Sequence, residues 1–127
     1  MVEDLIDTTV LVDLARYDPR AIGFMDASDA PRVCPDVCVA EMLLGVRSRA
    51  EIRAVATTIR EWFSVAFHGE SDARRALDLL QIYRPSHGVG YLDCLIAAMA
   101  IHRGLTVHSH NLKHMSPIRG LKVVRPY

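Results

Sequence analysis

Short apolar runs alternate along the chain with longer segments in which apolar positions recur every three or four residues. The first pattern predicts buried strands, and the second predicts amphipathic helices. The predicted strands cover residues 5–6, 32–34, 64–67, 105–108 and 122–124, and the predicted helices cover residues 10–16, 19–27, 36–45, 49–63, 71–83 and 91–102. Because strands and helices alternate in this order, we predict an α/β fold with three layers, in which helices cover both faces of a central parallel sheet.

Polar and glycine residues mark the ends of several predicted helices. Thr8 or Thr9 is expected to cap the first helix, and residues 48–51 have the sequence of a capping box. Residues 85–90 contain a proline and two glycines and are expected to form a loop, whereas Gly104 is expected to end the last long helix. No repeat or linker interrupts the pattern, so a single domain is predicted over residues 1–127.

The composition excludes several classes of protein. Half of the 127 residues are apolar, which is too many for a disordered chain, and fifteen basic side chains balance fifteen acidic ones, which argues against a non-specific basic nucleic-acid binder. The apolar runs fall short of the roughly 20 residues of a membrane helix. The acidic start Met1-Val2-Glu3-Asp4 also differs from a signal or transit peptide. We therefore expect a cytoplasmic protein that does not enter a membrane.

The cysteines and histidines do not follow a recognisable metal-binding pattern. Cys34, Cys38 and Cys94 are an odd number, so a disulfide framework is not expected. Pro35 separates the first two, no second pair follows at the spacing of a zinc site, and the four histidines after residue 101 are loosely spaced. We expect the cysteines to be small buried side chains in a reducing compartment.

Three acidic residues lie in apolar surroundings near the ends of predicted elements. Asp7 follows the apolar strand at residues 5–6, Glu41 lies within the apolar stretch 37–44, and Asp93 precedes the apolar run 94–99. A carboxylate in such a place is costly to bury unless it is paired or bound to a cation. Because ligands bind at the carboxyl ends of parallel strands, the position of Asp7 is already that of a site residue. Each acid taken singly could equally be a helix N-terminal charge or an exposed polar residue.

Taken together, the three acids suggest a shared Mg²⁺ or Mn²⁺ ion, because these hard cations prefer carboxylate oxygens. Such an ion lowers the pKa of bound water and offsets the negative charge that develops when a phosphodiester is hydrolysed. Mg²⁺ takes only one or two direct carboxylates, so further acids would hold its waters, and the hydroxyl of Thr8 or Thr9 could join them.

Four ordered motifs contain these acids and the end of the chain. They are Leu5-Ile6-Asp7-Thr8-Thr9-Val10-Leu11-Val12-Asp13, then Val39-Ala40-Glu41-Met42-Leu43-Leu44-Gly45, then Tyr91-Leu92-Asp93-Cys94-Leu95-Ile96-Ala97-Ala98, and last Gly104-Leu105-Thr106-Val107 with Asn111-Leu112-Lys113-His114-Met115 and Gly120-Leu121-Lys122-Val123. This order of motifs resembles the PIN-domain ribonucleases and, more narrowly, the VapC-type toxins of toxin–antitoxin pairs. The third motif is the most specific, and the likeness extends over essentially the whole chain.

The resemblance implies a PIN-like fold and an endoribonuclease that cleaves RNA with a Mg²⁺ or Mn²⁺ ion held by Asp7, Glu41 and Asp93. It also implies a homodimer and a cognate antitoxin that neutralises the toxin. In the resembled toxins the early helices form a groove for the C-terminal segment of the antitoxin, so a helix bound in a groove is expected here.

The fourth motif departs from the resembled family at two positions. Many relatives carry a fourth acid at the place of Asn111 or three residues later, where this chain has His114. Asn111 is expected to act as a fourth catalytic residue by binding a metal-bound water, or else to cap the following turn, and one ion is expected rather than two. Asp13 is expected to face solvent or pair with an arginine, and His108 and His110 to lie near the substrate.

Two other functions remain open at this stage. The missing fourth acid allows a catalytically silent PIN-like module that only binds a protein partner or RNA. A phosphatase with Asp7 as its nucleophile would use a similar sheet, but that class usually has a second Asp two residues later, where this chain has Thr9.

The neutral total hides an uneven distribution of charge. Residues 1–51 carry ten acids and five bases, whereas residues 52–127 carry five acids and ten bases. After Asp93 there are no acids, but there are five Lys or Arg residues and four His. If these basic residues lie beside the three acids, they offer a surface that faces phosphate, as an enzyme acting on a polyanion requires.

Overall fold

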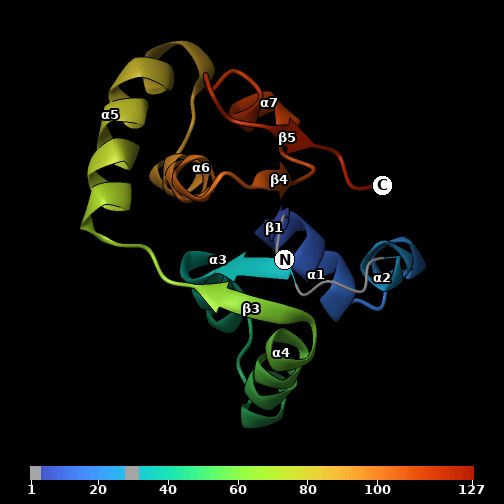
Figure 1. Ribbon diagram of the computed structural model, residues 1–127. Coiled ribbons are helices and arrows are strands. Elements are labelled where there is room, and N and C mark those ends of the chain that lie inside the picture. Colours follow the sequence, from blue (N-terminus) through green and yellow to red (C-terminus); the bar gives the residue numbers. More distant parts are fainter. Residues whose placement is uncertain (1–3, 28–31) are drawn as a thin grey trace.

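The computed structural model describes residues 4–27 and 32–127, which form a five-stranded parallel sheet surrounded by helices (Figure 1). The strands are β1 (Asp4–Ile6), β2 (Arg32–Pro35), β3 (Phe63–Ala66), β4 (Thr106–His108) and β5 (Val123–Val124). They lie in the order β3-β2-β1-β4-β5, and every neighbouring pair is parallel. The predicted α/β fold with a central parallel sheet is therefore confirmed.

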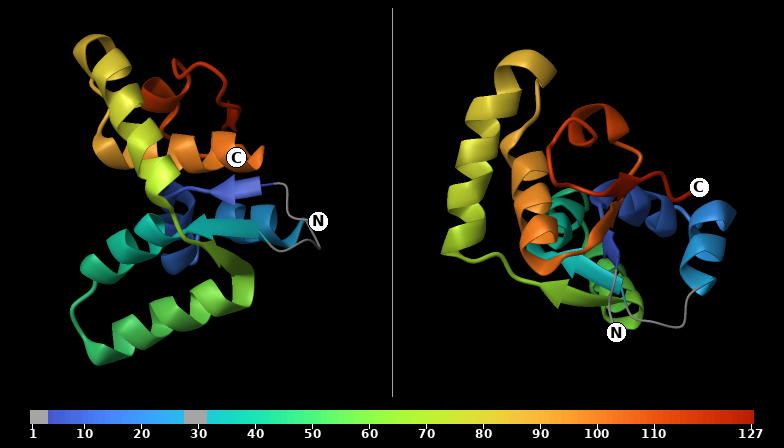
Figure 2. Two further views of the ribbon diagram at one scale, coloured as in Figure 1. Left: turned by 60° about the vertical axis from the view of Figure 1, so that its left-hand side comes forward. Right: turned by 45° about the horizontal axis from the view of Figure 1, so that its top comes forward.

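The helices lie in two groups along the chain. They are α1 (Thr8–Ala15), α2 (Pro19–Asp26), α3 (Asp36–Leu44), α4 (Arg49–Trp62), α5 (Glu70–His87), α6 (Tyr91–Arg103) and the short α7 (Leu112–Met115). Right-handed crossovers place the helices between β1 and β3 on one face of the sheet and the helices between β3 and β5 on the other. Figures 1 and 2 show α3 and α4 beside the β2–β3 end of the molecule, and α5, α6 and α7 at the β4–β5 end.

Helix α6 is the most buried helix because it packs both on the sheet and against α5. Its residues from Cys94 to Ala100 are all buried, in agreement with the apolar run in the sequence. They meet Leu5 and Ile6 of β1, whose side chains have no exposed surface, in a single core cluster. No helix in the described part of the chain is both long and apolar enough to cross a membrane.

The order of the strands creates a crevice at one edge of the sheet. Strand β1 is central and pairs with β2 on one side, where Leu5 is opposite Val33, and with β4 on the other, where Leu5 is opposite Val107. The chain leaves β1 toward β2 and reaches β4 only after returning from β3, so the carboxyl ends of β1 and β4 form the switch point where α/β proteins bind ligands. Asp7 directly follows β1, and its backbone N–H donates to the carbonyl of His108 at 3.1 Å.

Two predicted helix boundaries are wrong: the start of α1 and the end of α4. Asp7, not Thr8 or Thr9, is the N-cap of α1, so both threonines lie in the first turn of the helix. Phe63 is the first residue of β3 rather than the last residue of α4, and its side chain is buried in the core. Helix α2 ends at Asp26 with Ala27 as its C-cap, one residue before the predicted end, and residues 28–31 lie outside the described residues.

The predicted loop at residues 85–90 is wrong in its first half, because α5 continues through Pro85 to His87. A proline in a helix removes a backbone N–H donor and crowds the carbonyl four residues earlier, and Pro85 lies only two residues before the end of α5. The helix instead ends at Gly88, which has φ +67°, and Arg84 Nη1 donates to the carbonyls of Gly88 and Val89 at 3.1 and 3.0 Å. The Arg84 guanidinium thus holds the turn after the helix, while the Gly88 N–H donates to the Arg84 carbonyl at 3.0 Å and satisfies one of the carbonyl groups that a helix end leaves open.

Two glycine substitutions should change stability in opposite directions. Gly104 ends α6 with φ +65°, so Gly104→Ala should lower the free energy of unfolding by about 1 kcal/mol. Gly23 lies inside α2, and a Cβ added there meets nothing within 4 Å, so Gly23→Ala should raise it by about 0.5–1 kcal/mol. Urea denaturation with unchanged slope measures both effects. Equal effects of the two substitutions would contradict this account of α6.

Candidate active site

A hollow of about 230 Å³ opens at the crevice beside the carboxyl end of β1. We call it the acidic hollow, and its lining residues are Asp7, Thr8, Thr9, Val12, Glu41, Leu92, Asp93, Ile96 and Asn111. These residues come from α1, α3 and α6 and from the turns that follow β1 and β4. The structure therefore brings all four predicted site residues, Asp7, Glu41, Asp93 and Asn111, to one place.

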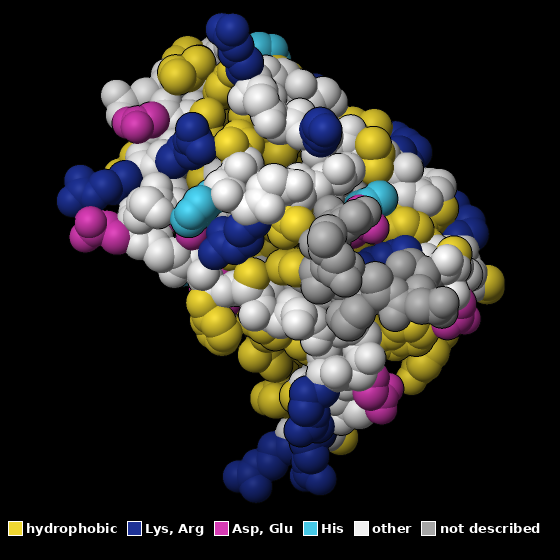
Figure 3. All heavy atoms as spheres, in the orientation of Figure 1, with side chains coloured by type: hydrophobic (Ala, Val, Ile, Leu, Met, Phe, Trp, Pro, Cys, Tyr) yellow, Lys and Arg dark blue, Asp and Glu magenta, His cyan; other side chains and the backbone are white. Residues whose placement is uncertain are grey.

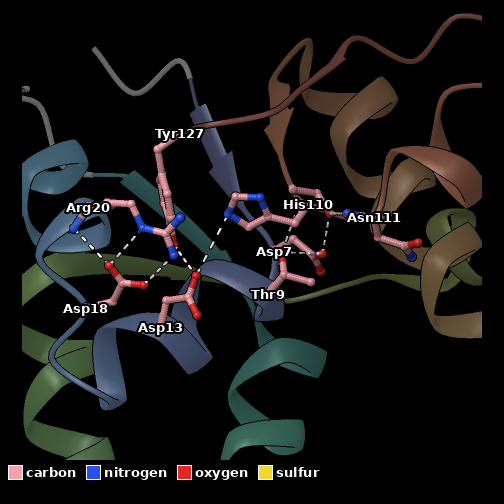
Figure 4. Close-up of polar contacts among 9 residues, drawn as sticks. Asp7, Thr9, Asp13, Asp18, Arg20, His110, Asn111 and Tyr127 are labelled. Atoms are coloured by element: carbon pink, nitrogen blue, oxygen red, sulfur yellow. Dashed lines mark hydrogen bonds and ion pairs between the residues drawn. The ribbon is translucent and has the colours of Figure 1, made fainter.

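Asp7 lies at the floor of the site, with only 6% of its surface exposed. Its Oδ2 accepts a hydrogen bond of 2.6 Å from the Ser109 hydroxyl and one of 3.3 Å from the Thr9 hydroxyl. Figure 4 shows Asp7 and Thr9 beside each other, next to the turn that carries His110 and Asn111. A buried carboxylate that accepts from two hydroxyl groups keeps a fixed orientation.

Glu41 reaches the hollow from α3. Its Oε1 accepts a hydrogen bond of 2.8 Å from the hydroxyl of Thr8, in the first turn of α1. This contact joins α1 to α3, which pack against each other. The acid that the sequence places among apolar neighbours is thus half-buried and turned toward the hollow.

Asp93 has two roles in the structure. Its Oδ2 accepts from the backbone N–H of Gly90 at 3.1 Å and so completes a cap at the start of α6. Its Oδ1 accepts from Nδ2 of Asn111 at 3.1 Å. One carboxylate oxygen of Asp93 therefore caps the helix, as expected of an acid at a helix N-terminus, and the other oxygen binds Asn111 at the hollow. Asn111 occupies the N-cap position of α7, yet its side chain binds Asp93 instead of capping that helix.

The donors around the three carboxylates are neutral. Within residues 4–27 and 32–127, no Lys, Arg or His forms an ion pair with Asp7, Glu41 or Asp93. In the same part of the chain, no three His, Cys, Asp or Glu side chains form a group that could hold a metal ion as they stand. Mg²⁺ needs only one or two direct carboxylates and keeps several waters. Three uncompensated carboxylates and two hydroxyls lining one hollow are therefore a donor set that fits this ion.

Sequence reasoning missed Ser109, which has no exposed surface and makes the shortest contact to Asp7. Ser109 follows β4 just as Asp7 follows β1, but only the sheet order shows that these two strands are neighbours, so no signal in the sequence alone pointed to Ser109. It also missed the apolar walls of the hollow, Leu92 and Ile96, which lie on either side of Asp93 on α6.

Three further expectations are resolved by the contacts. Among the described residues, Asp13 forms no ion pair with an arginine, and its Oδ2 accepts from the hydroxyl of Tyr127 at 2.5 Å. His108 Nε2 lies 3.0 Å from Asp4, and His110 Nε2 lies 3.9 Å from Asp13, so neither ring lines the acidic hollow. His114 does not line it either.

All three cysteines are buried, as predicted. Burial raises the pKa of the Cys34 thiol to about 12 and also raises the pKa of the Cys38 thiol. Both thiols therefore stay protonated and unreactive at neutral pH. Cys34 lies on β2 beside β1, and Cys38 lies on α3 with Glu41.

A second concave surface lies between α1, α3 and α4 and has a volume of about 370 Å³. We call it the α1–α4 groove, and its lining residues are Leu11, Leu14, Ala15, Arg16, Tyr17, Met42, Val46, Glu51, Ala54, Val55, Thr58 and Ile59. Most of its lining residues are apolar, and Arg16 and Glu51 are its charged ones. Figure 3 shows Lys and Arg side chains gathered at the lower end of the molecule, where α4 lies in Figure 1.

Comparison with protein families matches residues 5–113 to the PIN domain. Comparison with curated protein sequences gives no match. Among solved structures, the chain is similar to a toxin–antitoxin complex from Klebsiella pneumoniae, with a TM-score of 0.82 and 23% identity over 98% of each chain. It is also similar to DNA-bound VapBC from Salmonella typhimurium, with a TM-score of 0.83 and 17% identity over 100% of each chain.

A third similar structure is VapC20 of Mycobacterium tuberculosis, described as a toxin that cleaves the sarcin–ricin loop. It gives a TM-score of 0.73 at 14% identity, over 91% of this chain and 95% of that one. At such identities, the three structures show a shared fold and do not by themselves carry an activity over to this chain.

Proposed function

Because this chain belongs to the PIN domain family, we propose that it is a metal-dependent endoribonuclease and acts as the toxin of a toxin–antitoxin pair. The observation that carries this proposal is the convergence of Asp7, Glu41 and Asp93 on one hollow without a basic partner among the described residues. Three acids that line one hollow without a basic partner are costly to keep there unless a cation binds.

The proposed cofactor is Mg²⁺ or Mn²⁺, with Asp7, Glu41 and Asp93 as the residues that hold it. When bound, such an ion supplies activated water and offsets negative charge on the phosphodiester. The chain itself would contribute orientation. Ser109 and Thr9 fix the Asp7 carboxylate, Thr8 fixes Glu41, and Asn111 fixes the free oxygen of Asp93.

The apolar walls of the acidic hollow suit this chemistry as well. Leu92, which is 39% exposed, stands at its rim, and the buried Ile96 lies deeper. Such walls reduce the water around a bound phosphate and strengthen its interaction with charged and polar groups. Exposed Lys113, one residue beyond Leu112 at the start of α7, is the basic side chain nearest in sequence to the hollow and is a candidate for contact with the RNA backbone.

The proposed partner is a cognate antitoxin, and the α1–α4 groove is its proposed binding site. The groove has the apolar lining that the apolar face of a helix needs. Exposed arginines at the start of α4, Arg47, Arg49 and Arg53, favour acidic residues beside that face. Two of the similar structures described above are of toxins assembled with such partners.

We further propose that the chain is one domain that acts in the cytoplasm as a homodimer. Large apolar side chains exposed on α5, Leu77 at 52% and Ile82 at 63%, support a surface that a second copy covers.

Induced expression in bacteria separates the proposed toxin from a silent PIN-like module that only binds its partner. Expression of the chain should arrest growth, and co-expression of the proposed cognate antitoxin should restore it. A silent module would leave growth unchanged, and this outcome would overturn the proposed activity.

A further inference from the structure

Residues 109–111 form a bridge between two of the acids in the acidic hollow. At one end, the Ser109 hydroxyl donates to Asp7 at 2.6 Å. At the other end, Asn111 Nδ2 donates to Asp93 at 3.1 Å. The backbone N–H of Asn111 also donates to the Ser109 hydroxyl at 2.9 Å, so the two ends are tied to each other. The relative placement of Asp7 and Asp93 therefore depends on the conformation of this short turn.

The middle residue of the bridge, His110, is held from both sides. Its backbone N–H donates to the Thr9 hydroxyl at 3.1 Å, and that hydroxyl in turn donates to Asp7. Its imidazole ring meets the ring of Tyr127 edge-on, with centroids 4.6 Å apart. Figure 4 shows Tyr127 reaching down from the segment after β5 toward Asp13 and the ring of His110.

Tyr127 is itself fixed by residues of α1 and α2. Its hydroxyl donates to Asp13 on α1 at 2.5 Å. The guanidinium of Arg20 lies 5.5 Å from the centre of its ring and is held in place by Asp18, whose Oδ2 lies 2.8 Å from Nη2. The ring of Phe24 lies 6.0 Å from it on another side. Burial, and then the hydrogen bond to Asp13, raise the pKa of Tyr127, so its hydroxyl keeps the proton that it donates.

We propose that Tyr127, acting through Asp13 and His110, is a positioning residue that holds the 109–111 bridge and so fixes Asp7 and Asp93 relative to each other. Its consequence for metal binding and RNA cleavage rests on the proposed function, whereas its effect on the bridge does not. Tyr127 touches neither the acidic hollow nor its acids. Residues 109–111 are a short polar segment, and Tyr127 holds them from outside through its contacts with His110 and Asp13. We call these contacts the Tyr127 clamp.

Amide hydrogen exchange by NMR on the full chain tests the clamp without any metal. Tyr127→Phe removes only the hydroxyl and should make the His110 and Asn111 amides exchange about fivefold faster, the factor expected for the loss of one ordinary hydrogen bond. Tyr127→Leu removes the ring contact as well and should raise the exchange rate of both amides further.

The matched control is Tyr83→Phe. The hydroxyl of Tyr83 also makes one tertiary hydrogen bond, accepting from the backbone N–H of Arg119 at 2.9 Å. This variant should speed exchange of the Arg119 amide and leave His110 and Asn111 unchanged. If Tyr127→Phe and Tyr127→Leu leave exchange of the bridge amides at the wild-type rate, or if Tyr83→Phe speeds it equally, the positioning role is overturned.

Titration with Mn²⁺, followed by electron paramagnetic resonance, gives a second readout. Tyr127→Leu should bind Mn²⁺ about threefold to tenfold more weakly, as expected when support of a ligand is lost, and Tyr83→Phe should bind it as the wild type does. Faster exchange at the bridge in a protein whose wild type neither binds Mn²⁺ nor cleaves RNA would support the clamp and overturn the proposed function. If the Tyr127 variants leave exchange of the bridge amides unchanged while the wild type binds Mn²⁺ and cleaves RNA, the positioning role is overturned and the proposed function is supported.

Discussion

Asp7→Asn should slow RNA cleavage by about a thousandfold, which corresponds to about 4 kcal/mol of activation free energy. Asparagine has the size of aspartate and can still accept from the Ser109 hydroxyl, so the contacts of the floor of the hollow are kept. What is lost is the negative charge of the most buried acid, which is 6% exposed. The rate of cleavage of a labelled RNA under single-turnover conditions measures this loss.

The control for this substitution is Asp78→Asn, at an exposed acid on α5 away from the hollow, which should cleave RNA at the wild-type rate. Asp7→Asn should also fold at least as stably as the wild type without metal, because it removes one of three neighbouring charges. An Asp7→Asn protein that is folded and cleaves at the wild-type rate would exclude Asp7 from the mechanism.

Ala54→Arg should weaken binding of the antitoxin by about a hundredfold, equivalent to about 2.7 kcal/mol. Ala54 is exposed on α4 and lines the α1–α4 groove beside Val55 and Ile59. An arginine there would occupy the place of a partner side chain and put a charge into an apolar groove. Calorimetric titration with the proposed cognate antitoxin measures the affinity.

Ala56→Arg is the matched control, since Ala56 is also exposed on α4 but does not line the groove. It should bind the partner within about twofold of the wild type. RNA cleavage should be unchanged in both variants, because neither residue lines the acidic hollow. Equal binding by the two variants would place the partner elsewhere on the toxin.

The three acids that line the acidic hollow could be singled out from the sequence because each carries its own signal. A carboxylate that follows a buried strand, or lies within an apolar helix, is out of place unless it has a function. The order of strands and helices then predicts that Asp7 lies at the edge where ligands bind. For the same reason Cys34 and Cys38 could be recognised as buried, since nothing near them in sequence completes a metal site.

The supporting contacts could not be predicted, because they join segments that only the sheet order brings together. Ser109 and Asp7 are 102 residues apart, and Tyr127 and Asp13 are 114 residues apart. A serine and a tyrosine in polar segments have no unusual context of their own. Local rules also misplaced the end of α5, because Pro85 is tolerated where Arg84 and Gly88 complete the helix end.

RNA cleavage by the purified chain in Mg²⁺ and in excess EDTA tests the central claim most directly. The account predicts endonucleolytic cleavage with Mg²⁺ or Mn²⁺, none in EDTA, recovery when the ion is restored, and near-complete loss in Asp7→Asn, while Asp78→Asn cleaves normally. Cleavage that persists in EDTA and in Asp7→Asn would contradict it, as would intact RNA after incubation of the folded wild-type chain with either ion.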